Sequence, residues 1–378
     1  MKILYITPGC FDKGGISRYN RYQITACREL FGKENVKVFS LLGPSDDDFE
    51  DPFSVEWHGT GANRKSKMVL IFRVMKTTLL WKPDLILCAH VNLSGLAYLA
   101  SRLCRAETIL NAYGLEIWSH LSRDASWGLR KVKYIIADCR NTADWLVHHT
   151  RRKMESIRVI LDCIDLDKFK PQSPSPRVLQ KYHIPDPQHY FNVLSLGRLS
   201  LPDALYKGYD RLITVFDSLA QEYDQVRLII AGKGNYTDHL KKMVKEKKIA
   251  DKVMFTGSIG EEDLSSVYNS CNIFSLITEA GEGKGEGIPL TPLEAMACGK
   301  PILVGNQDGS REAVIGNNGF AMDPFNLKEH KRIIIQYIEN PGLQMAHSKE
   351  SLAVAHAYFS YNHFKQKHEQ FFNEISKY

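Results

Sequence analysis

The sequence lacks the features of a membrane-spanning, secreted or disulfide-bonded protein. No uninterrupted apolar run reaches the roughly 18 residues that a bilayer-spanning helix needs, and the first ten residues hold too short an apolar stretch for a signal peptide. The eight cysteines among 378 residues form no CxxC pair, so neither a disulfide framework nor a zinc site is indicated. We therefore predict a cytoplasmic protein with reduced thiols.

Signals for nucleic-acid binding are also missing. The formal net charge of +6 is modest for this length, and the basic clusters at 62–67, 129–133 and 151–153 lack interleaved aromatic residues or a reading helix. An acidic membrane surface or an anionic substrate fits these clusters better than a nucleic acid does. Solvated surface charge remains the simpler interpretation of any single cluster.

The chain is long enough for two domains, and both halves alternate apolar runs of strand length with helical patterns. Runs that are apolar almost without interruption are typical of parallel strands buried on both faces, so we predict two doubly wound parallel sheets. The segment 169–190 holds five prolines and no periodic apolar stripe, which predicts a linker and a domain boundary near residue 170. The predicted strands fall at 2–7, 36–42, 84–89, 107–113, 134–139, 158–164, 191–197, 226–232, 253–258, 273–278 and 301–305.

The C-terminal residues 361–378 predict an amphipathic helix that needs a surface to cover. Its apolar stripe consists of Phe364, His368, Phe371, Phe372 and Ile375.

In open α/β sheets, ligands bind beyond the carboxyl ends of the strands, so the loops after the strands carry the candidate site. Gly14 and Gly15 lie between the first strand and a helix, where backbone N–H groups can approach a ligand. Their spacing is not GxGxxG, which disfavours a dinucleotide fold. A plain tight turn explains this loop equally well when it is taken alone.

Two cations flank the exit of the first strand in the second half. Arg198 follows Gly197 directly after the strand, and Lys207 precedes the next helix. A guanidinium and an ammonium together suit a diphosphate. Gly232 and the stretch 255–259 add two more glycine-bearing strand exits, so a phosphate-lined cleft is the favoured interpretation of this edge.

The stretch GEGKGEGIPLTPLEAMACGKP, residues 281–301, joins a strand exit to a helix that begins with proline and ends at Gly299. Backbone amides at that helix start can hold a phosphate. Glu294, on the early turns, can accept hydrogen bonds from a ribose diol, while Glu286 can reach a polar group one sugar further along. Gly287, Ile288, Pro289 and Leu290 lie between these glutamates at the helix start and are further candidate ligand-binding residues.

These motifs together resemble the retaining glycosyltransferases of family 4, and the resemblance covers nearly the whole chain. It rests on the glutamate pair Glu286 and Glu294 followed by EAMACGKP, on GR…KG at 197–208, and on the glycine pair at 14–15. The stretches LDCIDLDKF, residues 161–169, and DGSREAV, residues 308–314, also look like the family's sequence.

The resemblance implies the GT-B architecture of two facing Rossmann-like domains with parallel sheets. An N-terminal acceptor-binding domain would span 1–170 and a nucleotide-sugar-binding domain 171–358. The helical segment 359–378 would cross back onto the first domain.

The resemblance also implies roles for the site residues. Arg198 and Lys207 would bind the donor diphosphate, Glu294 the ribose, and Glu286 hydroxyls of the transferred sugar, while Gly15 would let the first domain close over the phosphates. Sugar transfer would retain the anomeric configuration, and no residue identifies itself as a covalent nucleophile. The partners would be a nucleotide-diphosphate sugar as co-substrate and a glycan or lipid-linked acceptor in cell-surface polysaccharide synthesis.

Two departures from the family pattern concern the first half. Tyr113 stands where relatives often carry a histidine, and Asp162–Cys163 stands where an asparagine–glycine pair is common. His90, after the third strand, is better explained as a satisfied polar group than as a catalyst.

We expect no cofactor and no metal, because no DxD-like pair ends a strand and two fixed cations can stabilise the departing phosphate. A phosphorylase-like or epimerase enzyme, and a nucleotide-sugar-binding protein without transfer activity, remain as alternatives.

The stretch SKMVLIFRVMKTTLLW, residues 66–81, combines apolar residues with Lys67, Arg73 and Lys76. It predicts either an ordinary core helix of the first domain or a contact with the inner face of the membrane.

Overall fold

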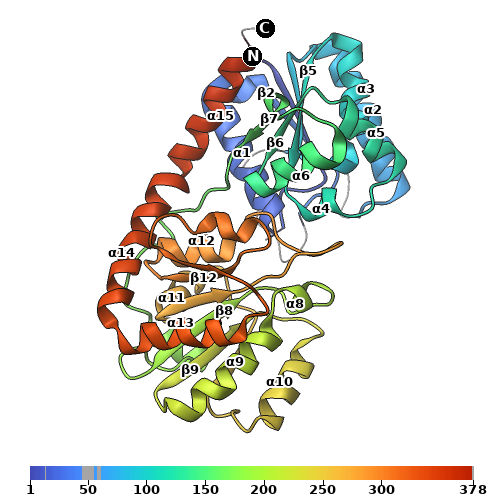
Figure 1. Ribbon diagram of the computed structural model, residues 1–378. Coiled ribbons are helices and arrows are strands. Elements are labelled where there is room, and N and C mark those ends of the chain that lie inside the picture. The colour runs from blue at the N-terminus through green and yellow to red at the C-terminus, as the bar shows by residue number, and fades with distance from the viewer. Residues whose placement is uncertain (13, 45–54, 58–60, 377–378) are drawn as a thin grey trace. The chain divides into compact units, whose positions relative to one another are not determined.

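The computed structural model describes residues 1–12, 14–44, 55–57 and 61–376, and the chain divides into two compact units (Figure 1). Unit 1 comprises Met1–Cys163 and Tyr361–Tyr378, and unit 2 comprises Ile164–Ser360. The last two residues of the predicted segment 359–378 lie outside the described residues.

Unit 1 contains a seven-stranded sheet in the order β3-β2-β1-β4-β5-β6-β7, and its neighbouring strands pair in parallel. Strand β3 is a two-residue edge strand without an apolar run, so the apolar pattern did not predict it. The strands are β1 (Ile3–Thr7), β2 (Val36–Ser40), β3 (Glu56–Trp57), β4 (Leu85–Cys88), β5 (Glu107–Ala112), β6 (Tyr134–Ala137) and β7 (Ile157–Val159).

Helices cover both faces of this sheet. One core is formed between the strands and α1 and α15, and another forms beneath α2, α3, α5 and α6. The helices are α1 (Gly15–Phe31), η1 (Lys33–Asn35), α2 (Arg64–Trp81), η2 (Val91–Leu93), α3 (Ser94–Cys104), α4 (Leu115–Trp118), α5 (Arg123–Lys131), α6 (Arg140–Thr150), η3 (Met154–Ser156) and α15 (Tyr361–Ile375).

Unit 2 contains a six-stranded parallel sheet in the order β10-β9-β8-β11-β12-β13. Its last strand, β13, is a short edge strand that the apolar pattern did not predict. The strands are β8 (Phe191–Leu196), β9 (Val226–Ala231), β10 (Val253–Gly257), β11 (Ile273–Leu276), β12 (Ile302–Gly305) and β13 (Gly319–Met322).

Two groups of helices pack on the sheet of unit 2, and Figure 1 shows α9 and α12 on opposite faces. Helices α9, α10 and α13 pack together, as do α7, α11, α12 and α14. The helices are α7 (Pro176–Lys181), α8 (Asp203–Tyr206), α9 (Tyr209–Glu222), α10 (Thr237–Glu246), α11 (Leu264–Asn269), α12 (Leu290–Ala297), η4 (Gly309–Ala313), α13 (Leu327–Glu339) and α14 (Pro341–Tyr358).

The prediction of two parallel α/β sheets is confirmed. The proline-rich segment 169–190 packs within unit 2, because the Ser175 amide donates to Ser266 at 2.7 Å and Arg177 pairs with Asp263 at 3.0 Å. The chain passes from one unit to the other at Cys163–Ile164. All eight cysteines lie in the described residues, and none of them forms a disulfide there.

Helix α15 returns to unit 1 as the resemblance implied, and its predicted apolar stripe is fully buried there. The stripe packs against residues of α1, with Phe364 edge-on to Tyr19 and Phe372 edge-on to Phe31. Burial of these large side chains is the principal free-energy gain that holds α15 on unit 1.

His368 ties α15 into a buried polar network. Its Nδ1 lies 2.9 Å from the carbonyl oxygen of Phe364, and its Nε2 lies 2.9 Å from the side-chain amide nitrogen of Gln23 on α1. The neutral tautomer with the proton on Nδ1 satisfies both contacts, because Nε2 then accepts from Gln23. Gln23 also bonds with Asn111 of β5 and Tyr5 of β1, so the network joins the helix to the sheet.

This network predicts that acid weakens the fold of unit 1. Burial lowers the pKa of His368 from 6.5 to about 4, so the unfolded chain takes up this proton at a higher pH than the folded protein does. The stability due to neutral His368 is full above pH 6.5 and is lost as pH falls toward 4, with a loss on the order of 2 kcal/mol by pH 5. We expect the melting temperature to fall less between pH 7 and pH 5 in His368→Gln than in the wild type. A His148→Gln variant, at an exposed histidine of α6, should track the wild type. Equal pH dependence in all three proteins would contradict this role.

Candidate functional site

The strand order of unit 2 reverses between β8 and β11, which are neighbours in the sheet although β9 and β10 lie between them in sequence. Loops that leave the carboxyl ends of two such strands diverge and leave a crevice, where open α/β sheets bind ligands. The loop after β8 carries Gly197 and Arg198, and the loop after β11 runs to Glu286. The loops that carry Arg198 and Glu286 therefore leave the sheet of unit 2 at its switch point.

Glycines allow very close backbone packing beside Lys207. A Cβ atom on Gly232 would lie 1.9 Å from the carbonyl oxygen of Gly197, and Gly232 has a φ of 139°. A Cβ atom on Gly197 would lie 2.7 Å from the Tyr209 hydroxyl and 3.6 Å from the Lys207 ammonium. Neither glycine can carry a side chain without displacing its neighbours, so the segments after β8 and β9 can pack this closely only with glycine at both positions.

Lys207 and Glu286 form an ion pair, with 3.0 Å between Nζ and Oε1. Their side chains are only 11% and 21% exposed, so water screens the pair less than a surface pair. The Tyr206 hydroxyl donates to the same carboxylate oxygen at 3.2 Å. Burial, and next the charge of Glu286, raises the pKa of Tyr206, which keeps the hydroxyl protonated as a donor.

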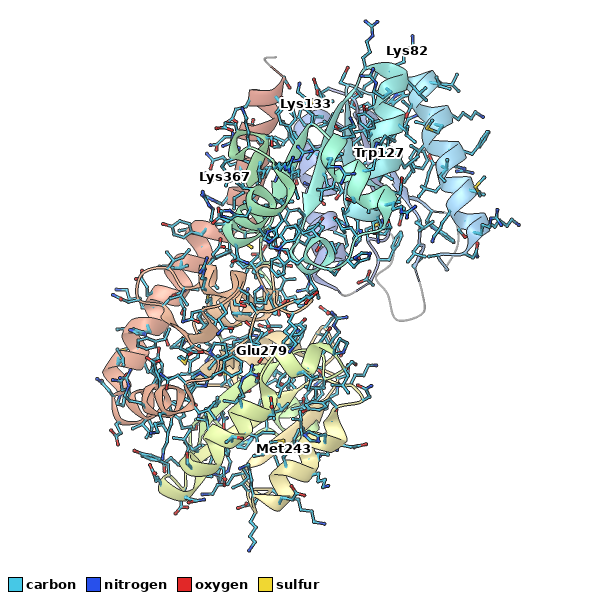
Figure 2. The ribbon with its side chains drawn as sticks, turned by 45° about the vertical axis from the view of Figure 1, so that its right-hand side comes forward. Lys82, Trp127, Lys133, Met243, Glu279 and Lys367 are labelled. Carbon is cyan, nitrogen blue, oxygen red and sulfur yellow. The ribbon has the colours of Figure 1, made fainter. Side chains whose placement is uncertain are left out.

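The loop between β11 and α12 is fastened by charged contacts at both ends. Glu279, labelled in Figure 2, pairs with Arg211 of α9 at 2.7 Å and with Lys284 at 3.0 Å. At the other end, buried Asp308 accepts the backbone N–H of Glu286 at 2.9 Å. The loop thus presents the Glu286 carboxylate on an anchored backbone rather than on a free chain.

The carboxyl group of Asp308 has a higher pKa than an ordinary aspartate. Burial raises its pKa, although it also accepts the Ser310 N–H at 3.0 Å. It lies in the DGSREAV stretch that contributed to the family resemblance, but that pattern did not reveal that Asp308 holds Glu286.

Arg198 occupies a different environment from Lys207. Its side chain is 78% exposed, and its guanidinium pairs with Asp203 of α8 at 2.9 Å. An exposed ion pair is worth little, so this guanidinium can exchange Asp203 for a ligand at small cost. The structure brings Lys207 and Glu286 into contact and leaves Arg198 at the surface beside α8.

Glu294 lies inside unit 2, with 3% of the residue exposed, and the Tyr268 hydroxyl of α11 donates to its Oε2 at 2.6 Å. It sits on α12, whose N-cap is Pro289 and whose first turn starts at Leu290. Among the described residues, no side chain caps this helix, so its first amides are available to an anion. Gly287 and Ile288 form the buried approach to that terminus.

The glycine pair of unit 1 opens α1, with Gly14 as N-cap and Gly15 as first residue. The side chain of Asp12 occupies this helix start. It accepts hydrogen bonds from the Gly14 N–H, at 2.7 Å, and from the Ser17 hydroxyl. Sequence reasoning missed Asp12, although its place two residues before the glycines is typical of a side chain that turns onto a helix start.

The other candidates of unit 1 make structural contacts. The Tyr113 hydroxyl donates to Asn20 at 2.8 Å, and His90 Nδ1 accepts the Asn92 N–H at 3.2 Å. Asp162 accepts the N–H of Cys163 at 2.7 Å. Burial lowers the pKa of His90, which favours the neutral ring.

Glu116 is a further carboxyl group that sequence reasoning overlooked. Burial raises its pKa to about 8, even though its Oε1 accepts the Tyr113 N–H at 2.6 Å. Its position in the first turn after β5 places it among the strand exits of unit 1, where a ligand-binding residue is expected.

Solved structures show that two Rossmann-like units with these parallel sheets belong to the GT-B fold. The structure of Anabaena Alr3699/HepE in complex with UDP aligns over 100% of both chains with a TM-score of 0.78 and 21% identity. A glycosyltransferase from Rickettsia africae aligns over 100% of this chain and 99% of its own, with a TM-score of 0.80 and 17% identity.

Residues 183–352 match the family model of glycosyl transferases of group 1, and they form a domain of that family. The resemblance to these glycosyltransferases is thereby confirmed.

Curated relatives extend the similarity. A GDP-mannose-dependent alpha-(1-6)-phosphatidylinositol monomannoside mannosyltransferase of Mycobacterium tuberculosis is 30% identical over 59% of this chain and 58% of its own. The mannosylfructose-phosphate synthase of Agrobacterium fabrum is 31% identical over 53% and 44%. The matched stretch thus spans about half the length of these relatives.

The close approach of Gly232 to Gly197 yields a prediction about the site's framework. Gly232→Ala should destabilise unit 2 by more than about 2 kcal/mol and weaken donor binding, because the new methyl group clashes with a backbone oxygen and the φ is unfavourable. Gly257→Ala is the matched control, since φ is also positive there but a Cβ atom meets nothing within 4 Å. Chemical denaturation and donor titration measure the two effects. Similar losses in both variants would show that the contact with Gly197 is unimportant.

Proposed function

We propose that this chain is a retaining glycosyltransferase that moves a sugar from a nucleotide-diphosphate sugar to a glycan or lipid-linked acceptor in cell-surface polysaccharide synthesis. The contact between Lys207 and Glu286 at the switch point of unit 2 carries the proposal, because it sets a cation for a phosphate beside a carboxylate for sugar hydroxyls. Unit 2, residues 164–360, would bind the donor, and unit 1 the acceptor.

The relatives support both substrate classes. The mycobacterial relative is GDP-mannose-dependent and acts on a phosphatidylinositol monomannoside, and the Anabaena structure holds UDP. A lipid-linked acceptor would bring this chain to the cytoplasmic face of a membrane as a peripheral protein. None of the described helices combines the length and apolar character that crossing a bilayer demands.

The chemistry we infer centres on the departing diphosphate. Breaking the glycosidic bond creates an oxocarbenium-like sugar while negative charge grows on the phosphate. Lys207, Arg198 and the free amides of α12 would stabilise that charge without a metal ion. Departure and attack on the same face of the sugar, assisted by the leaving phosphate, would retain the configuration without a covalent nucleophile.

Hydrogen bonds to the donor sugars would complete the site. Glu286, already oriented by Tyr206 and Lys207, would accept from hydroxyls of the transferred sugar. Glu294, which lies on α12, would accept hydrogen bonds from the ribose hydroxyls. Gly15 would allow unit 1 to approach the phosphates.

The direct test is a screen of GDP- and UDP-sugars by thermal shift, followed by acceptor-dependent release of free nucleotide. A bound donor at a hundred times its dissociation constant stabilises the fold by about 2.7 kcal/mol. Stabilisation without nucleotide release on any acceptor would identify a binding protein instead.

The two glutamates should affect different steps. Glu286→Ala should lower kcat more than it weakens donor binding, because its proposed partner is the transferred sugar. Glu294→Gln should mainly raise the donor Kd, and it keeps the volume and an acceptor for the Tyr268 hydroxyl. Steady-state kinetics together with calorimetry separate the effects. Near-normal values for both variants with a confirmed donor would leave the carboxylates with structural roles only.

Both cations should be needed for turnover, and a divalent metal should not. Arg198→Ala and Lys207→Ala should each lose at least about a hundredfold in kcat, the usual effect of removing one preorganised charge-stabilising donor. Lys242→Ala, at a 75% exposed lysine of α10, is the control and should stay active. Activity should survive excess EDTA. If chelation abolishes turnover, magnesium restores it and the alanine variants remain active, the assignment is wrong.

A further inference from the structure

Helix α2 of unit 1 buries an unusually narrow stripe. Its buried residues are Ser66, Leu70, Val74 and Thr78, one in each turn, and two of them are polar. Large apolar side chains lie elsewhere on the helix: Met68, Phe72 and Leu79 are 60%, 66% and 53% exposed. At 3.6 residues per turn these three point away from the buried stripe, so the outer face of α2 is apolar and has no covering element in the described chain.

The neighbouring helix extends this face. Helices α2 and α3 pack against each other on the same side of the sheet, as Figure 1 shows, and α3 exposes Leu99 and Leu103. We call the exposed apolar residues of both helices the α2–α3 face. Soluble proteins scatter single exposed apolar residues, whereas a group of them on adjacent helices marks an interaction surface.

The two helices of this face carry charges of one sign only, and Arg73 of α2 pairs with Glu56 of β3 at 2.7 Å. Helices α2 and α3 contain no aspartate or glutamate. Lys82, labelled in Figure 2, follows the C-terminal end of α2. Lys65 and Lys76 lie beside the apolar stripe and are exposed. The basic residues of the two helices are Arg64, Lys65, Lys67, Arg73, Lys76 and Arg102.

We propose that the α2–α3 face docks unit 1 onto a bilayer that contains anionic lipids. Apolar side chains would enter the headgroup and acyl boundary while the lysines meet lipid phosphates, as interfacial helices do. A second copy of the chain fits this face less well, because a twofold contact would set two helices with only positive charges against each other. The inference rests on the proposed function in one respect: a lipid-linked acceptor lies in such a bilayer.

Co-sedimentation with vesicles tests the proposal without donor or acceptor. The wild type should bind vesicles of phosphatidylcholine with one third phosphatidylglycerol at least tenfold more tightly than vesicles of pure phosphatidylcholine, and rising salt should weaken the binding. Phe72→Glu with Leu79→Glu should lose at least tenfold in affinity for the anionic vesicles. Met345→Glu, at a 72% exposed methionine on α14 of unit 2, is the matched control and should bind as the wild type does.

Two results would overturn the proposal. One is equal vesicle binding by the double variant and the wild type. The other is a wild-type dimer in sedimentation velocity that the double variant converts to a monomer, since a second copy would then cover the face. Nucleotide release on a water-soluble acceptor should be unchanged in the double variant, and a wild type that binds vesicles but transfers no sugar would refute the proposed function while leaving the docking surface standing.

Discussion

Parallel strand pairing is the constraint on which the rest of this molecule depends. Because each strand must return through a helix to run in the same direction as its neighbour, every strand of a sheet ends at one edge. In unit 2 that edge collects loops distant in sequence, and it sets Lys207 against Glu286 across 79 positions of chain. Glycine at 197 and 232 allows the chain segments after β8 and β9 to pack closely at that edge.

The ion pair between Lys207 and Glu286 has an electrostatic consequence for ligand binding. Two opposite charges, both largely shielded from water, satisfy each other and avoid the cost of an unpaired buried charge. A dianionic ligand would draw the ammonium toward itself and leave the carboxylate to other donors, such as sugar hydroxyls or Tyr206. Lys207 and Glu286 are therefore energetically coupled, and replacing either residue removes the countercharge of the other.

The apolar runs predicted eleven of the strands because buried parallel strands need apolar residues on both faces. They could not predict β3 or β13, whose edge positions demand little burial. The glutamate spacing and the GR…KG pattern singled out the two loops that Lys207 and Glu286 join. They did not predict the contact itself, because spacing along a chain does not specify which loops meet. Asp12, Asp308 and Glu116 escaped notice for a related reason: their importance comes from burial and from backbone groups nearby, which are properties of the fold.

Because α15 lies at the end of the chain, the folding of unit 1 during synthesis differs from that of unit 2. The ribosome makes the sheet of unit 1 first, then all of Ile164–Ser360, and only afterwards the helix that covers Tyr19 and Phe31. At about 5–20 residues per second, that interval lasts roughly 10–40 s. During translation the nascent first unit therefore exposes an apolar groove that a chaperone could shield, whereas unit 2 can complete its own core without waiting for a distant segment.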